Sequence, residues 1–154
     1  ARAAGSALSY VKPHGALYNT VMVDTGQARA VAEAVSAVDP ALPVLGQAGS
    51  VFFAEADRLG LRTVAEVFAD RGYLPDGRLA PRGTAGSVLH DPAVIAERVS
   101  AMVSAGTVTA MDGSAVRLEV ESVCVHGDSP GAVDIATAVR SRLLADGVGL
   151  AAFT

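Results

Sequence analysis

Ionisable side chains in this sequence gather where short apolar segments end, and they are of types that move protons. His14 and His126 are each followed by glycine, which lets the backbone turn tightly and approach a ligand closely. Glu66 and Asp70 supply carboxylates that could transfer protons or bind a metal. Lys12 is the one lysine among 12 basic residues, which hints that this position needs an ammonium group. The set predicts acid–base chemistry.

A second group of residues is typical of anion binding. Segment 126–131 follows an apolar run and precedes a helix signal, so its backbone N–H groups could form a nest for a negative charge. Gly127, Ser129 and Gly131 are the positions expected to supply these N–H groups. Asp128 places a carboxylate beside the imidazole of the same segment.

The basic side chains allow more than one interpretation. Lys12 and Arg71 could hold a carboxylate or a phosphate of a ligand. Glu66 and Asp70 could instead form simple ion pairs with Arg71. Arg82 follows a proline and could fasten a loop as well as touch a substrate. The sequence leaves these alternatives open.

The elements that position these residues alternate between strands and helices. Asp24 with Gln27, and Asp91 with Pro92, are helix-start signals, and Gly106 ends the second of these helices. This alternation predicts a mostly parallel sheet covered by helices, with reactive groups at the carboxyl ends of the strands. The expected strands are 8–12, 44–47, 62–68 and 122–125, the expected helices start near 24, 50, 91 and 129, a hairpin spans 107–119, and 69–88 is irregular.

Composition excludes several classes of protein. The 154 residues suit one domain, 1–154, and 51% hydrophobic residues are enough for a core. A net charge of −4 argues against a nucleic-acid groove, and no apolar run is long enough for a membrane span. The single cysteine, Cys124, excludes an internal disulfide, suits a reducing cytoplasm and is expected in the core.

Four motifs together resemble one known family. They are Val-Lys-Pro-His-Gly-Ala-Leu-Tyr-Asn at 11–19, Glu-Val-Phe-Ala-Asp-Arg-Gly-Tyr at 66–73, Pro-Arg at 81–82 and Val-His-Gly-Asp at 125–128. In this order they closely resemble the LamB/YcsF family, whose members form the A subunit of the bacterial ATP-dependent 5-oxoprolinase. The resemblance implies part of an irregular seven-stranded β/α barrel, similar to glycoside hydrolase/deacetylase barrels. The family's opening motifs are not found in this sequence, so we expect the first strands of the barrel to be missing.

The resemblance also implies an activity. The family opens 5-oxoproline (pyroglutamate) to glutamate with ATP hydrolysis, so ATP with Mg²⁺ is the expected co-substrate and subunits B and C are the expected partners. Missing first strands would leave one edge of the sheet open, and a further copy of the chain could cover this edge. Any metal ligands would come from the missing part. Carried over motif by motif, the expected catalytic residues are His14, Glu66, His126 and Asp128, and the expected substrate-binding residues are Lys12, Tyr18, Asn19, Asp70, Arg71 and Arg82.

A mechanism can be sketched on these residues. Phosphorylation of the amide oxygen would make a better electrophile, which water then attacks. The base would be His126 assisted by Asp128, or Glu66, and the 127–131 backbone would stabilise the oxyanion. Two other hypotheses are a metal-dependent, deacetylase-like amide hydrolase and a non-catalytic subunit that binds substrate or organises partners. The sequence has no Walker loop, so it does not itself predict ATP binding.

Overall fold

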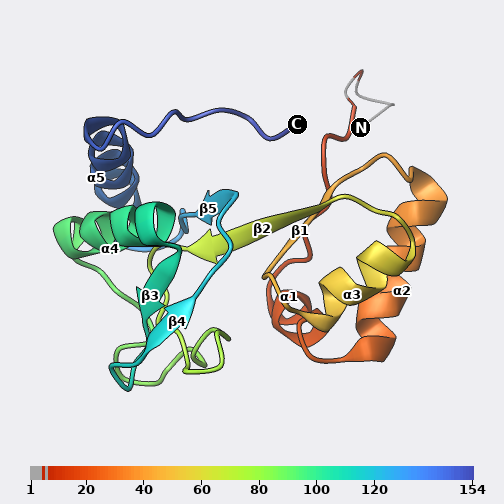
Figure 1. The fold of residues 1–154 in the computed structure, drawn as a ribbon, viewed down its shortest axis with the longest axis horizontal. Coiled ribbons are helices and arrows are strands. Elements are labelled where there is room, and N and C mark those ends of the chain that lie inside the picture. Colours follow the sequence, from red (N-terminus) through yellow and green to blue (C-terminus); the bar gives the residue numbers. More distant parts are fainter. Residues whose placement is uncertain (1–4, 6) are drawn as a thin grey trace. The chain divides into compact units, whose positions relative to one another are not determined.

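The computed structural model of the chain describes residue 5 and residues 7–154 (Figure 1). Its contacts fall into two compact units: unit 1 holds Ala1–Glu66 and Phe153–Thr154, and unit 2 holds Val67–Ala152. The boundary falls within strand β2 (Thr63–Phe68), so this one strand contributes residues to both units. Each unit has its own helices and its own buried side chains.

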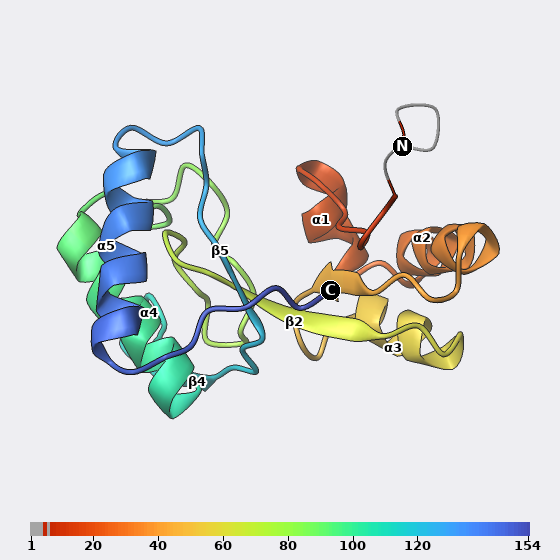
Figure 2. The same cartoon turned by 90° about the horizontal axis from the view of Figure 1, so that it is seen from above.

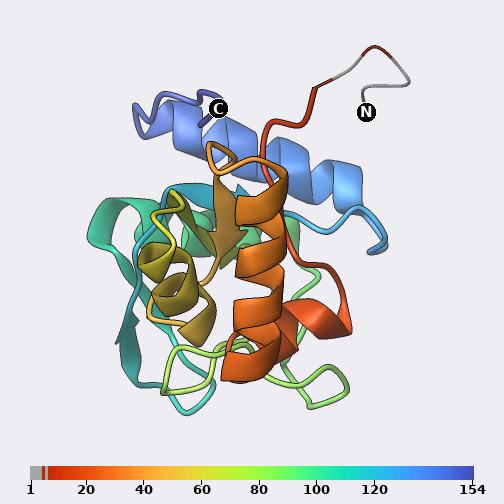
Figure 3. The same ribbon diagram turned by 90° about the vertical axis from the view of Figure 1, so that its right-hand side faces the viewer.

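Unit 1 combines a short parallel sheet with helices. β1 (Val44–Gly46) pairs in parallel with β2, and Val44 lies opposite Thr63. α2 (Thr25–Val38) and α3 (Val51–Arg58) pack against each other, and α3 also contacts β1 (Figure 3). The parallel pairing and the helix cover confirm the α/β architecture that the sequence predicts.

Both longer helices of unit 1 begin near the predicted positions. Asp24 Oδ1 accepts a hydrogen bond from the Gln27 backbone N–H at 2.8 Å, so the helix starts at the next residue, Thr25. Ser50 Oγ accepts from the Phe53 N–H at 3.3 Å and caps α3 in the same way. Each cap satisfies a donor that a helix start would otherwise leave unpaired.

The expected strand at 8–12 is shorter than predicted. Only Val11 pairs, through a parallel bridge to Val44, and Pro13 follows without the N–H that would extend the ladder. The next element, α1 (Ala16–Val21), was not predicted. Its six residues are too few to show a helical period in the sequence.

Unit 2 is built on two packed helices. α4 (Pro92–Ala105) and α5 (Ala132–Ala145) lie side by side (Figure 2). The hairpin strands β3 (Thr107–Thr109) and β4 (Ala115–Arg117) pair antiparallel as expected, and β5 (Ser122–Cys124) follows them. The helices enclose a core that includes Ile95, Val99, Ile135, Val139 and Leu143.

In unit 2, α4 begins and ends where predicted, whereas α5 begins later than predicted. Asp91 caps α4, and Gly106 ends it in the left-handed region with φ 61°, both as predicted. The last helix was expected to start at Ser129 and Pro130, but it starts at Ala132. Gly131 has φ 74°, a left-handed conformation that prevents an α-helix from continuing back through it.

The stretch 69–88 is irregular, as predicted, but it is tied down. Arg71 forms an antiparallel bridge with Val88, and Tyr73 forms one with Leu79. A side chain at Gly72 would place Cβ 2.8 Å from the Gly86 carbonyl oxygen, so only glycine allows this close approach. Both ends of this stretch are therefore packed into unit 2, whereas residues 81–86 are exposed.

Two smaller expectations concern the surface and the core. Cys124 was expected in the core, but it is only half-buried because β5 is a partly covered strand throughout. Among the helices in the described part of the chain, none has the length and apolar character needed to cross a membrane.

Candidate functional site

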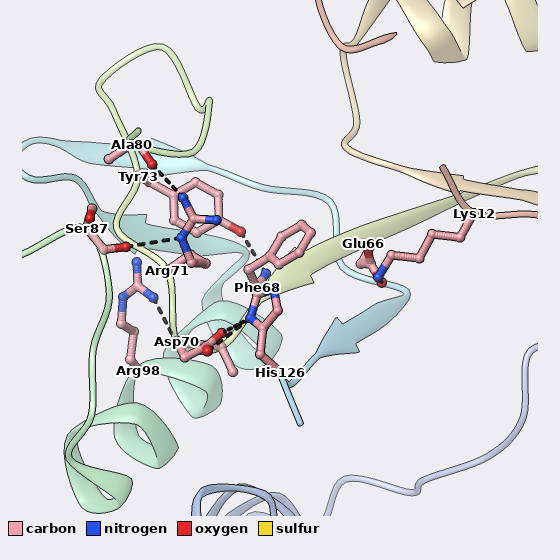
Figure 4. A network of polar contacts seen from close by, with 11 residues as sticks. Lys12, Glu66, Phe68, Asp70, Arg71, Tyr73, Ala80, Ser87, Arg98 and His126 are labelled. Carbon is pink, nitrogen blue, oxygen red and sulfur yellow. Dashed lines mark hydrogen bonds and ion pairs between the residues drawn. The ribbon is translucent and has the colours of Figure 1, made fainter. Parts of the chain in front are cut away.

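Two buried carboxylates lie within and just after β2, and each contacts one basic side chain (Figure 4). Glu66 and Asp70 have 4% and 1% of their surface exposed. Glu66 belongs to unit 1 and pairs with Lys12, whereas Asp70 belongs to unit 2 and pairs with His126. The sequence-based alternative, in which both acids pair with Arg71, is therefore wrong.

The Asp70–His126 pair has the geometry of an acid–base dyad. His126 Nδ1 lies 2.8 Å from Asp70 Oδ1 and 3.0 Å from Oδ2. An ionised carboxylate can only accept, so Nδ1 donates its N–H and the neutral ring keeps an acceptor lone pair on Nε2. The His126 side chain is 20% exposed, against 2% for Asp70, so the imidazole reaches solvent while its partner does not.

Neighbouring side chains fix the orientation of this dyad. The Phe68 ring stacks on the His126 imidazole with centroids 5.7 Å apart and planes at 25°. The Phe68 backbone N–H donates to the Tyr73 hydroxyl oxygen at 2.8 Å. Arg98 from α4 lies over the Tyr73 ring at 5.3 Å and donates to the Ala69 carbonyl at 3.1 Å. The end of β2 is thus held on both sides of Phe68, which restricts the positions open to His126.

The Lys12–Glu66 pair is a tight ion pair. Lys12 Nζ donates to Glu66 Oε1 at 2.6 Å, and the same ammonium lies 5.7 Å from the Tyr18 ring centroid. Glu66 Oε2 is buried and has no hydrogen-bond partner among the described residues. Glu66 balances the Lys12 charge, so the ammonium is less suited to binding a ligand carboxylate than the sequence suggested.

Arg71 fastens the long loop, which is the role that the sequence offered for Arg82. Its Nε donates to the Ser87 carbonyl at 3.2 Å and its Nη2 to the Ala80 carbonyl at 2.5 Å. Burial lowers the pKa of the Arg71 guanidinium, and the like charge of Arg82 lowers it further. Arg82 itself is exposed.

The expected partnership between His126 and Asp128 is wrong. The carboxylate that contacts His126 is Asp70, while Asp128 is exposed. The error has a physical cause: Asp128 is near in sequence, but the chain turns at 127–131 to start α5, and Asp70 arrives from the end of β2.

The other expected residues divide between the two units. In unit 1, Tyr18 is buried, His14 is exposed, and exposed Asn19 donates to the Gly15 carbonyl at 3.4 Å. In unit 2, Gly131 is the N-cap of α5, and as a glycine it has no side chain that could cap the helix. The catalytic roles expected of His14 and His126 stay predictions, as does the anion-binding role of Gly127, Ser129 and Gly131.

Sequence reasoning missed Arg98, Phe68 and Tyr73 as parts of the site. A signal for Arg98 was present, because it lies three residues after Ile95 and four before Met102, on the buried stripe of α4. Phe68 and Tyr73 were within the quoted motif, but their contacts with the imidazole and with the backbone depend on tertiary structure.

The described residues do not form a recognisable metal or nucleotide site. Within residue 5 and residues 7–154, no three His, Cys, Asp or Glu side chains are grouped so that they could hold a metal ion. The sequence has no phosphate-binding loop of the Walker type, so no ATP step is assigned to residues of this chain.

A parallel α/β sheet with a buried carboxylate–imidazole pair at a strand end defines an α/β protein with a candidate acid–base site. The model of the LamB/YcsF family matches residues 1–154, and the chain belongs to this family.

Similar proteins agree with this assignment. The chain is 69% identical over 153 residues to the 5-oxoprolinase A subunit of Mycobacterium avium, and this match covers 99% of the chain and 61% of the relative. It is 53% identical over 152 aligned positions to the 5-oxoprolinase A subunit of Cutibacterium acnes, and this match covers 96% of the chain and 59% of the relative. The chain therefore spans about three fifths of the length of these curated relatives.

A solved structure supports the fold. The crystal structure of the Lactam Utilization Protein from Thermus thermophilus is 45% identical, with a TM-score of 0.90. The match covers 99% of this chain and 60% of that protein. The α/β fold with a parallel sheet is confirmed. The closed barrel stays a prediction, and the expectation of missing first strands is not borne out by this match.

Proposed function

We propose that this chain is part of the A subunit of an ATP-dependent 5-oxoprolinase, which opens the lactam ring of 5-oxoproline to give L-glutamate. Support comes from the family membership and from relatives named as the 5-oxoprolinase A subunit at up to 69% identity. The observation that carries the chemical part is the Asp70–His126 dyad, with Nδ1 held by a buried carboxylate.

The dyad supplies the proton transfers that ring opening needs. Water adds its oxygen to the lactam carbonyl carbon, the ring C–N bond breaks, and the nitrogen leaves as an amine that takes a proton. His126 Nε2 accepts the proton from the attacking water, and the resulting imidazolium returns a proton to the leaving nitrogen. Asp70 stabilises the imidazolium and keeps the ring in the required tautomer.

Other groups complete the proposal. The backbone N–H groups at 127–131 are the candidates for stabilising the oxyanion that forms on the carbonyl oxygen. Tyr18 and Asn19 remain proposed substrate contacts. His14 remains a proposed catalytic residue, and Glu66 remains a proposed acid or base held by Lys12. ATP with Mg²⁺ is the proposed co-substrate of the assembled enzyme, which would contain subunits B and C, and phosphoryl transfer is left to the assembly.

The test is ATP-dependent release of glutamate by the full-length protein with its partner subunits. His126→Asn keeps a side-chain N–H for Asp70 but removes the base, so turnover should fall by about 10²–10⁴-fold. His90→Asn is the matched control, because His90 is an exposed histidine just before the cap of α4, and its turnover should not change. Equal turnover in both variants would refute the role of His126. Hydrolysis that needs a divalent metal but not ATP would support the amide-hydrolase alternative instead.

A further inference from the structure

Positive charge exceeds negative charge around the Tyr73 ring in unit 2. Arg71 donates only to carbonyl oxygens, and Arg98 donates to one carbonyl and lies over the ring. The nearby acid is Asp70, and both its oxygens already contact His126. Within residue 5 and residues 7–154, neither arginine forms an ion pair with an acid.

This arrangement is costly for a structural feature. Arg71 is only 5% exposed, and a guanidinium remains charged at neutral pH. Loss of hydration on burial lowers the pKa of the Arg71 and Arg98 side chains, and the negative charge of Asp70 offsets only part of this effect. Buried charges are normally paired with an opposite charge, and carbonyl dipoles replace only part of that interaction.

The two guanidinium groups also retain donors. A guanidinium has five N–H groups, and the described residues accept two from Arg71 and one from Arg98. The accepting carbonyls belong to Ala80, Ser87 and Ala69, and they fix both groups in place near the Tyr73 ring (Figure 4). Groups held in place before a ligand arrives lose little entropy on binding it.

We propose that Arg71 and Arg98, together with exposed Arg82, bind the oxyanion of a small molecule, either a carboxylate or a phosphate. A planar anion would accept two parallel N–H bonds from a guanidinium, which is the strongest form of this contact. It would also offset the repulsion through which Arg82 lowers the pKa of Arg71. The inference rests on the proposed function for one candidate ligand, the carboxylate of 5-oxoproline.

Loop fastening alone does not explain the cluster. It accounts for the two bonds of Arg71 to the loop carbonyls. It does not account for the second arginine, Arg98, which approaches from α4 although both oxygens of Asp70, the nearby acid, already contact His126.

The test is calorimetric binding to the full-length protein. Arg98→Met keeps the length of the side chain over Tyr73 but removes the charge, and Arg78→Met is the control, because Arg78 lies exposed on the same loop and pairs with Asp76. The ligands are 5-oxoproline, inorganic phosphate and 2-pyrrolidinone, which is the same lactam ring without a carboxylate. Melting curves confirm that each variant is folded.

We expect Arg98→Met to bind at least one of the two anions about tenfold more weakly or worse, while Arg78→Met binds like the wild type. Loss confined to 5-oxoproline identifies a carboxylate site, and loss confined to phosphate identifies a phosphate site. Binding of 2-pyrrolidinone should not change. Arg82→Gln should show a smaller loss for the same anion.

Equal anion binding by Arg98→Met and the wild type, or no anion binding by the wild type, would overturn the inference. The proposed function is tested separately, by measuring turnover. If anion binding depends on Arg98 but the assembled enzyme releases no glutamate, the anion site stands and the proposed activity falls.

Discussion

Each of the two units of this chain has a buried carboxylate with one basic partner, and the two partners differ. Unit 1 buries Glu66, which lies within β2, and unit 2 buries Asp70, which lies just after this strand. Glu66 is paired with an ammonium, and Asp70 with an imidazole. An ammonium strongly holds its proton at neutral pH, whereas imidazole is the side chain that gains and loses one there. The type of partner therefore makes the Asp70–His126 pair better suited to moving protons than the Lys12–Glu66 pair.

Breaking the pair in unit 1 should give the largest effect on stability. Lys12→Met leaves the buried Glu66 charge uncompensated, and removing one partner of a buried pair costs about 3–5 kcal/mol of unfolding free energy. The Lys12 side chain is 26% exposed, so we expect the lower end of that range. Urea unfolding measures the change.

Substitution of the other partner of this ion pair should cost less. Glu66→Gln leaves an ammonium that can turn towards water, so it should cost about 1–2 kcal/mol. Arg78→Met breaks the exposed pair with Asp76 and should change the unfolding free energy by less than about 0.5 kcal/mol. If Lys12→Met is no worse than Arg78→Met, Glu66 does not depend on Lys12 for its charge balance.

A smaller loss is expected from the support of the dyad in unit 2. Tyr73→Phe removes the hydroxyl oxygen that accepts the Phe68 N–H at 2.8 Å. A buried N–H without an acceptor costs about 1–3 kcal/mol. Tyr10→Phe is the control, because Tyr10 is 45% exposed, and it should have little effect on thermal unfolding. Equal melting temperatures for the two variants would contradict the role of the Tyr73 hydroxyl.

The smallest effect should be a change in acid stability. Hydrogen bonding from Ser100 and the Arg142 guanidinium lower the pKa of Asp146 below its usual value. A carboxyl whose folded-state pKa is lowered adds stability above its unfolded pKa, and this stability is lost as the pH falls through the folded value. Asp146→Asn should therefore flatten the fall in melting temperature at acid pH, whereas Asp57→Asn, an exposed acid of α3, should not. Parallel curves for Asp146→Asn and the wild type would refute this.

Local signals were sufficient for much of the fold. Capping aspartates marked the starts of α2 and α4, and Gly106 marked the end of α4, because these residues act on their own backbone. The short α1 has no period to read, and the late start of α5 depends on the left-handed conformation of Gly131.

The site was harder to predict because its contacts join distant residues. His126 and Asp70 lie 56 positions apart, and Lys12 and Glu66 lie 54 apart. The acidic and basic residues of the site could be predicted from the sequence. Asp128 was nevertheless predicted as the partner of His126, because the two are close in the chain. Partner choice depends on which strand ends meet in the folded unit, and a pattern in one sequence does not contain that information.

In the proposed mechanism Asp70, and not Asp128, positions His126. The most direct measurement is the pH profile of ATP-dependent glutamate release by the full-length enzyme carrying Asp70→Asn or Asp128→Asn. We predict that Asp70→Asn loses about 10²-fold or more in turnover and alters the limb of the profile that reports the base, while Asp128→Asn behaves like the wild type. A loss confined to Asp128→Asn, with an unchanged profile for Asp70→Asn, would show that Asp70 does not position His126.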